Sequence, residues 1–265
     1  MKWCMLTLVV LALILQFHAS YGHPQVPCFF IFGDSLSDSG NNNNLPTLAK
    51  ANFLPYGIDF PGGSTGRFTN GRTTVDIIGY HLGLEGYIPP FASVKDSDIN
   101  KGVNYASGSS GIRPETGVQV TLHETGARKV IVFGVGPLGC LPPITALGEC
   151  SAYINRVLEM YNTKLKSLVD TLNAKFTDAK FIWINTIAIV SNDLRGLGLR
   201  VRTIPCCGAG VCLPLTIPCS NRGEFAYWDL FHPTEAANRV LADRAFSAKQ
   251  ETDAYPMDIS HLAQL

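Results

Sequence analysis

A short apolar run that stops abruptly at a glycine sets the strongest constraint on how this chain can fold. Residues 29–32 have the composition of a buried strand, and Gly33, Asp34 and Ser35 follow directly. Because glycine ends the apolar pattern, Ser35 is expected where the strand turns toward solvent. In open α/β sheets, ligands bind at the carboxyl ends of the strands. Ser35 is therefore the first candidate nucleophile.

The rest of the chain alternates apolar runs with segments of helical periodicity. Residues 130–133, inside a predicted strand over 129–136, are typical of a parallel strand buried on both faces. Residues 153–176 carry apolar side chains at helical spacing, so one face is expected to pack on the sheet. The other expected elements are strands at 102–106 and 181–190, a helix at 74–82, and a helix with Pro233 in its first turn that ends near 246; residues 247–265 are assigned no structure. The alternation predicts an α/β fold with a doubly wound parallel sheet.

The charge balance and the N-terminal segment limit the possible function classes. The 21 Lys and Arg residues balance the 21 Asp and Glu residues, so nothing predicts a nucleic-acid partner, and a neutral small molecule or polymer is expected instead. Residues 1–22 have the form of a secretory signal peptide, with Lys2 before an apolar run too short for a membrane span; an uncleaved anchor is the alternative. We expect residues 23–265 to form one exported, monomeric domain.

The cysteines are expected to form disulfides, because an exported chain folds in an oxidising compartment. There is no Cys-x-x-Cys pair and no histidine at zinc-ligand spacing, so no metal site is expected. Of the 8 cysteines, Cys4 lies in the predicted signal peptide, which leaves an odd number, and Cys28 is predicted to be the unpaired one. We expect a bridge between Cys140 and Cys150, and pairing among Cys206, Cys207, Cys212 and Cys219 in which the two adjacent cysteines have different partners. Spacing alone does not give the connectivity.

Asp229 and His232 could complete a catalytic group with Ser35. A serine that cleaves esters needs a base to take its proton, a carboxylate to orient that base, and hydrogen-bond donors for the developing oxyanion. Asp229 and His232 are three residues apart, just before a predicted helix, so Asp229 could hold one imidazole nitrogen while the other faces Ser35. An Asp-x-x-His pair alone is weak evidence, because a surface aspartate and a helix-capping histidine are common. The serine at a strand end makes the pair more informative.

Four sequence blocks in a fixed order extend this interpretation: FGDSLSDSGNN at 32–42, NYASG at 104–108, GARKV at 126–130 before GPLGC at 136–140, and WDLFHPTEA at 228–236. Together they resemble the plant GDSL esterase/lipase family of the SGNH hydrolases, over nearly the whole chain after residue 22. The resemblance implies a flavodoxin-like three-layer α/β/α fold with a parallel sheet, and a hydrolase of carboxylic esters, of lipids or of the cell wall, that acts without a cofactor. It also implies secretion to the cell wall or apoplast.

The resemblance assigns roles to particular residues. Ser35 would be the nucleophile, His232 the general base and acid, and Asp229 its orienting partner. The backbone N–H groups of Ser35 and Gly108 would be oxyanion donors. Asp34 is instead expected to brace the turn. Arg67 and Arg72 could clamp an anion or buttress a turn, and the composition around them favours the turn.

This chain departs from the family between residues 109 and 128. The family has a further block, Gly-x-Asn-Asp, at the end of a strand in this region, and its asparagine is a third oxyanion donor. Here only 20 residues lie in the interval, enough for a minimal crossover of about a dozen residues but not for another strand with its own helices. We therefore expect an internal truncation near 117–121 and a sheet that lacks a central strand.

Two functional hypotheses follow from this departure. The first is an active esterase, and the second is a non-catalytic truncated variant that at most binds lipid or cell-wall esters. Asn192, in Ser-Asn-Asp at 191–193, imitates the lost block, but it follows a strand expected at the far edge of the sheet. A turn that ends this strand is the favoured role for Asn192.

Overall fold

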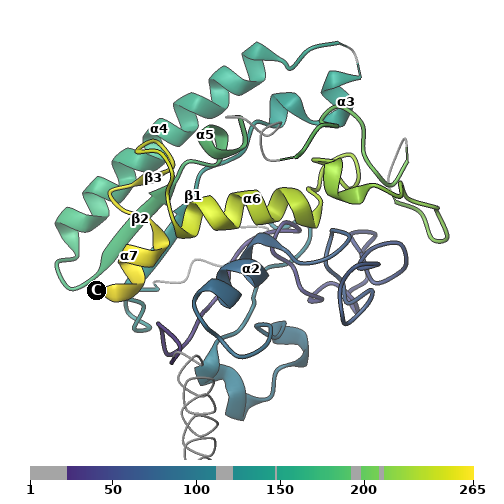
Figure 1. The fold of residues 1–265 in the computed structure, drawn as a ribbon. Helices are drawn as coiled ribbons and strands as arrows, with labels where there is room; N and C mark the ends of the chain where they lie inside the picture. Colours follow the sequence, from purple (N-terminus) through teal and green to yellow (C-terminus); the bar gives the residue numbers. More distant parts are fainter. Residues whose placement is uncertain (1–22, 112–121, 147, 192–197, 209–211) are drawn as a thin grey trace, which may run out of the picture.

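The computed structural model describes residues 23–111, 122–146, 148–191, 198–208 and 212–265 (Figure 1). The predicted signal peptide, the expected truncation near 117–121 and Asn192 lie outside these ranges. The helices are α2 (Thr74–His81), α3 (Pro142–Thr145), α4 (Ala152–Lys175), α5 (Thr186–Ser191), α6 (Glu235–Phe246) and α7 (Ile259–Gln264), and the strands are β1 (Lys129–Phe133), β2 (Lys180–Ile184) and β3 (Ala254–Tyr255). Short 3-10 helices occupy Phe91–Ser93, Asp96–Lys101, Leu138–Cys140 and Arg222–Glu224.

The sheet has the order β1-β2-β3 and is mixed. β1 and β2 are parallel, with Lys129 opposite Lys180 and Phe133 opposite Ile184. β3 runs antiparallel to β2, so the prediction of a wholly parallel sheet is wrong at this edge, as is the prediction of no structure in residues 247–265. β2 is also shorter than predicted, because the side chain of Asn185 accepts a hydrogen bond from the backbone N–H of Ala188 and begins α5.

Helices cover both faces of this sheet (Figure 1). Successive strand residues point to opposite faces. Accordingly, Phe181 and Trp183 of β2 pack with Val169 of α4. Ile182 and Ile184 pack on the other side, with residues of α2, α6 and α7. The architecture of the described residues is therefore α/β.

The long helix α4 confirms the predicted helix to within one residue at each end. Only part of the predicted apolar face packs on the sheet, however. Val169 is buried, while Val157 and Leu168 are each 49% exposed. In their place Asn162 is buried, and its side-chain amide bonds both the N–H and the C=O of Val135, 2.8 Å away in each case.

The opening apolar run is not the fully buried strand that was predicted. Ile31 forms one isolated parallel bridge with Asn104, and the predicted strand at 102–106 is reduced to this bridge and one between Asn104 and Pro90. Ile31 is 5% exposed, whereas Phe30 and Phe32 are 40% and 51% exposed. The physical reason is that only one side of the run is covered. Ile31 packs with Val75 of α2, whereas the Phe32 ring on the other side stacks on the Tyr105 ring.

Helix α2 connects this segment to the sheet. Its Val75 packs with Ile31, and its Ile77 and Ile78 belong to the core cluster that includes β2 and α6. The helix begins where predicted, because Thr73 and Asp76 form a capping box in which each side chain bonds the backbone N–H of the other residue. Packing between α2 and α6 therefore places the Ser35 turn relative to the segment that leads into α6.

Candidate active site

The structure brings Ser35, His232 and Asp229 together in one hydrogen-bonded chain. Ser35 Oγ lies 2.8 Å from His232 Nε2, although the two residues are 197 positions apart. His232 Nδ1 lies 2.8 Å from both carboxylate oxygens of Asp229. Because an ionised carboxylate can only accept, Nδ1 carries the proton and Nε2 is free to accept from the serine.

A tight turn fixes Asp229 and His232 before α6. Asp229 Oδ1 accepts hydrogen bonds from the backbone N–H groups of Phe231 and His232, at 2.9 and 2.8 Å. The Trp228 N–H donates to the His232 carbonyl, and the fully buried Trp228 ring anchors the segment. Thr234 is the N-cap of α6, in an extended conformation, so Pro233 precedes the cap and the prediction that it occupies the first turn is wrong.

Burial and hydrogen bonds act in opposite directions on the Asp229 carboxyl. Asp229 is 2% exposed, and burial raises its pKa. Hydrogen bonds and the charge from His232, with further hydrogen bonds from Tyr56 and from the Phe231 N–H, outweigh burial and leave the pKa below its ordinary value. The side chain therefore stays ionised at neutral pH, as a partner of a histidine base requires.

Two aromatic residues that sequence reasoning missed complete the surroundings of this pair. The Tyr56 hydroxyl donates to Asp229 Oδ2 at 2.7 Å, across 173 positions of sequence. The Phe68 ring lies 5.0 Å from the His232 ring, inclined by 35°. Both come from a glycine-rich irregular stretch without periodicity, so no spacing signal pointed to them.

The turn that carries Ser35 is braced by Asp34, as predicted. Asp34 Oδ1 accepts the Leu36 N–H at 2.9 Å, and the Asp34 carbonyl accepts the N–H groups of Ser37 and Asp38. No acceptor within the described parts of the chain binds the N–H of Ser35. That N–H could therefore donate to a substrate oxygen.

Gly108 does not offer the free donor that was predicted. Its N–H donates to Asp38 Oδ2 at 2.8 Å, and the other oxygen of Asp38 accepts the N–H groups of Gly40 and Asn41. Asp38 is fully buried, and burial raises its pKa despite these bonds. A buried carboxyl needs hydrogen-bond partners, and Gly108 is one of them here. In this conformation the Gly108 N–H is therefore occupied, and its role as an oxyanion donor stays a prediction.

The asparagine run after the Ser35 turn is a structural brace. Asn41 Nδ2 donates to the carbonyls of Asn104 and Ala106, at 2.8 and 2.7 Å. Asn42 accepts from the Ser107 hydroxyl and donates to the Gly108 carbonyl. Several amide side chains directly after a strand-end turn are the sequence signal for such a brace.

The arginines of residues 66–72 buttress turns. Arg67 is buried and makes a bidentate ion pair with Asp76 of α2, with Nε 2.7 Å from Oδ2 and Nη2 2.8 Å from Oδ1. Arg72 pairs with Glu235 of α6 at 2.8 Å. The alternative of an anion clamp is not favoured, because both guanidinium groups already have a carboxylate partner.

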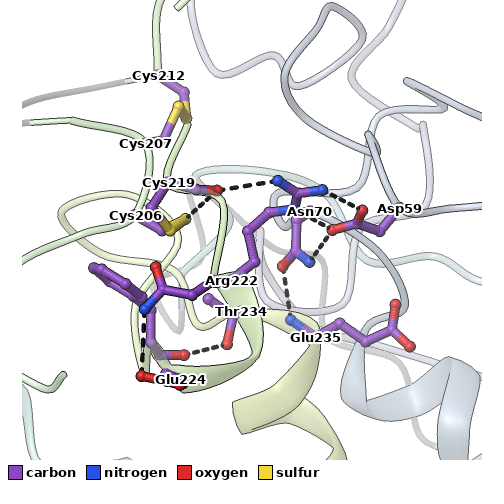
Figure 2. Close-up of a disulfide and its surroundings, with 12 residues drawn as sticks. Asp59, Asn70, Cys206, Cys207, Cys212, Cys219, Arg222, Glu224, Thr234 and Glu235 are labelled. Carbon is purple, nitrogen blue, oxygen red and sulfur yellow. Dashed lines mark hydrogen bonds and ion pairs between the residues drawn. A yellow bond between two sulfur atoms is a disulfide. The ribbon is translucent and has the colours of Figure 1, made fainter. Parts of the chain in front are cut away.

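Disulfides staple the cysteine-rich loop (Figure 2). The loop lies next to the Asp229 turn, because the backbone N–H groups of Cys206 and Cys207 donate to the carbonyls of Tyr227 and Trp228. The disulfides are Cys140–Cys150, Cys206–Cys219 and Cys207–Cys212, and Cys28 is unpaired. The first bridge, the different partners of Cys206 and Cys207, and the unpaired Cys28 confirm the predictions, whereas the pairing within the loop had been left open. Figure 2 shows Arg222 reaching from this loop to Asp59, whose carboxylate also accepts a bond from Asn70. Asn70 in turn accepts the N–H of Glu235 at the start of α6. These bonds join the loop that contains Tyr56 and Asp59, the cysteine-rich loop and the start of α6.

The described ranges contain neither a metal-ligand cluster nor a membrane-spanning helix. No group of three or more His, Cys, Asp or Glu side chains there is arranged to hold a metal ion. No helix within the same ranges combines the length and apolar character needed to span a membrane.

Comparisons with known proteins agree with the geometry of the site. The family model "GDSL-like Lipase/Acylhydrolase" matches residues 29–125 and 116–245. GDSL esterase/lipase At1g29670 of Arabidopsis thaliana is 38% identical over 360 residues, covering 100% of this chain and 98% of the relative. GDSL esterase/lipase 7 of the same plant is 34% identical over 368 residues, covering 100% of both chains.

The alignments with these relatives are longer than this chain. An alignment over 360 positions against a chain of 265 residues leaves 95 positions at which this chain has no residue. The two matches to the family model meet at residues 116–125. With family matches that cover most of its length and relatives above 30% identity, this chain belongs to the GDSL lipase/acylhydrolase family of carboxylic ester hydrolases.

Proposed function

We propose that this chain is a secreted serine hydrolase that cleaves carboxylic esters of lipids or of cell-wall acyl groups through a covalent acyl-enzyme. One observation carries the proposal: the hydrogen-bonded chain from Ser35 Oγ through His232 to Asp229, with 2.8 Å at each step. Family membership supports the reaction class, because the matched relatives are named esterases or lipases.

The first half-reaction forms the acyl-enzyme. Ser35 Oγ attacks the ester carbonyl carbon while His232 Nε2 takes the hydroxyl proton. Asp229 stabilises the imidazolium that results, through the Nδ1–H bond. The Ser35 N–H donates to the oxyanion of the tetrahedral intermediate. The imidazolium then gives its proton to the leaving alcohol as the carbon–oxygen bond breaks, and the acyl group stays on Ser35.

The second half-reaction releases the acid. A water molecule attacks the acyl carbon while His232 Nε2 again accepts a proton, and the collapse of the second intermediate returns that proton to Ser35 Oγ. All four proton transfers of the cycle go through His232 Nε2, and the first and the last of them use its 2.8 Å contact with Ser35 Oγ. No metal or cofactor is needed in this sequence of steps.

A second candidate function, the binding of esters with little or no turnover, is supported by the shortage of oxyanion donors. The Gly108 N–H is occupied by Asp38, and the relatives have 95 aligned positions that this chain lacks. We infer that the missing positions form an internal segment removed near 117–121, where the two family matches meet. Loss of one oxyanion donor costs about 10²- to 10³-fold in rate. A chain without two such donors would turn over slowly, or would only bind lipid or cell-wall esters.

The fold and the location of the protein belong to the same proposal. Helices on both faces of β1 and β2 support a flavodoxin-like three-layer core, from which the truncation has removed a central strand. Three disulfides support folding in an oxidising compartment, consistent with a signal peptide at 1–22.

Ester hydrolysis by the purified chain tests the proposal. We expect residues 23–265 to hydrolyse a short-chain p-nitrophenyl ester, and Ser35→Ala to reduce the rate to that of buffer. Ser37→Ala is the matched control, because Ser37 lies two residues further along the same turn and its hydroxyl makes no hydrogen bond within the described ranges. Wild-type protein that melts cooperatively but hydrolyses no ester would contradict the active-esterase proposal and favour the binding variant.

A further inference from the structure

The carboxylate of Asp229 has a donor that the Ser35–His232–Asp229 chain itself does not require. Besides His232, Tyr56 is the one side chain within the described residues that donates to it, at 2.7 Å from Oδ2. Tyr56 and Asp229 are each 2% exposed, so water does not compete for this bond. A hydrogen bond to a buried carboxylate is about twice as strong as one between neutral groups.

The phenol of Tyr56 remains a donor whatever the pH of an assay. Burial, followed by the charge of Asp229 and the hydrogen bond to it, raises the pKa of Tyr56 far above its usual range. Oδ2 of Asp229 therefore shares its negative charge between Tyr56 and His232 Nδ1.

Packing fixes the position of the Tyr56 hydroxyl. Its ring meets Phe53 edge-on at 5.4 Å and Phe68 edge-on at 6.1 Å. Its backbone carbonyl accepts the Ser64 hydroxyl at 2.7 Å. The same cluster contains Trp228, next to Asp229 in sequence, and the bridged cysteines 206, 207 and 212. This disulfide-bridged cluster thus holds the Tyr56 hydroxyl in place beside Asp229.

We propose that Tyr56 is a positioning residue that acts through Asp229, fixing the rotation of its carboxylate and withdrawing part of its charge from His232. The proposal deepens, and rests on, the proposed function of the Ser35 site. Without the Tyr56 hydroxyl, the Asp229 carboxylate would direct more of its negative charge toward the imidazole of His232. This would stabilise the protonated form of His232. A protonated His232 cannot take the proton of Ser35, so the donor extends the pH range of activity on the acidic side.

Tyr56→Phe removes the hydroxyl and keeps the ring. A hydrogen bond to a charged group is stronger than one between neutral groups, but only part of its strength differs between the two protonation states of His232. We therefore expect kcat/KM at neutral pH to fall roughly tenfold with little change in KM, and the acidic limb of the pH profile to move up by about half a pH unit to one unit. Tyr227→Phe is the matched control: burial raises the pKa of Tyr227 to about 12, but its hydroxyl makes no hydrogen bond within the described ranges.

A double-mutant cycle separates positioning from simple loosening of the structure. If Tyr56 acts through Asp229, Tyr56→Phe changes the pH profile of the wild type but not that of Asp229→Asn. A structural defect would lower kcat in both backgrounds and leave the acidic limb where it was. An unchanged limb in a folded Tyr56→Phe protein overturns the proposal.

An NMR titration keeps this test independent of activity. The imidazole signals of His232, identified by their loss in His232→Asn, should change at a higher pH in Tyr56→Phe than in wild type and in Tyr227→Phe. If the wild type hydrolyses no ester, the proposed function fails while this measurement still decides the role of Tyr56. In wild-type protein, the Tyr56 hydroxyl proton should exchange slowly with water, a result that needs no variant and whose absence also contradicts the proposal.

Discussion

The buried ion pair between Arg67 and Asp76 gives the sharpest prediction about stability. Both side chains are only 5% exposed. Asp76 accepts two hydrogen bonds from Arg67, and Oδ2 also accepts the backbone N–H and the hydroxyl of Thr73 in the capping box. Asp76→Asn keeps the shape of the side chain but removes its charge, so the guanidinium of Arg67 is left buried without a counter-ion.

The expected cost follows from these contacts. Removing one partner of a buried ion pair costs about 3–5 kcal/mol, because the remaining charge stays desolvated. The NH₂ group of the new asparagine would also face the N–H and the hydroxyl of Thr73, which are themselves donors. This weakens the helix cap, which contributes about 1 kcal/mol. For a chain of this size, 1 kcal/mol lowers Tm by roughly 2–4 °C. We therefore expect Asp76→Asn to lower Tm by about 10–20 °C.

Thermal unfolding followed by circular dichroism measures this effect, with Asp98→Asn as the control. Asp98 pairs with Lys101 at 3.6 Å, and these side chains are 47% and 83% exposed. Exposed pairs contribute about 0–1 kcal/mol, so this variant should melt within a few degrees of wild type. Equal and small shifts in the two variants would refute the argument that the Arg67–Asp76 pair is desolvated.

Two further predictions concern Asp229 and the disulfides. Because the pKa of Asp229 in the folded chain lies below its ordinary value, its ionised form stabilises the fold above about pH 4, and this contribution is lost as the pH falls further. The Tm of Asp229→Asn should therefore fall less than that of wild type as the pH is lowered from about 5 to 3, and parallel curves would contradict this. Replacing Cys206 and Cys219 together by serine should cost about 3 kcal/mol, measured by urea unfolding. Non-reducing peptide mapping should find Cys28 as the free thiol, and a different pairing would refute the disulfide assignment.

Local patterns predicted those parts of the fold that depend on nearby residues. The helices α2 and α4 follow from periodicity and capping, and β1 from its continuous apolar run. β3 could not be predicted, because two residues form a strand only when β2 is beside them. The burial of residues 29–32 was overestimated for a related reason: an apolar run does not reveal whether both of its faces will be covered.

In the candidate site, too, residues in local motifs were predicted and long-range contacts were not. Ser35, Asp229 and His232 were recognised because each lies in a compact motif, and Asp34 because a turn needs a local acceptor. Tyr56 contacts Asp229 across a long loop, which no spacing rule encodes. The bond from the Gly108 N–H to Asp38 was not foreseen, because Asp38 was not considered as a buried acceptor.

Covalent labelling with a fluorophosphonate probe tests the central claim most directly, because the probe reacts only with an activated serine and does not require turnover. We expect wild-type protein to gain the mass of one probe, mapped to the peptide that contains Ser35. Ser35→Ala should not be labelled, His232→Ala should be labelled far more slowly, and Ser37→Ala should react like wild type. Folded wild-type protein that remains unlabelled, or that is labelled at another residue, would contradict the claim that His232 and Asp229 activate Ser35.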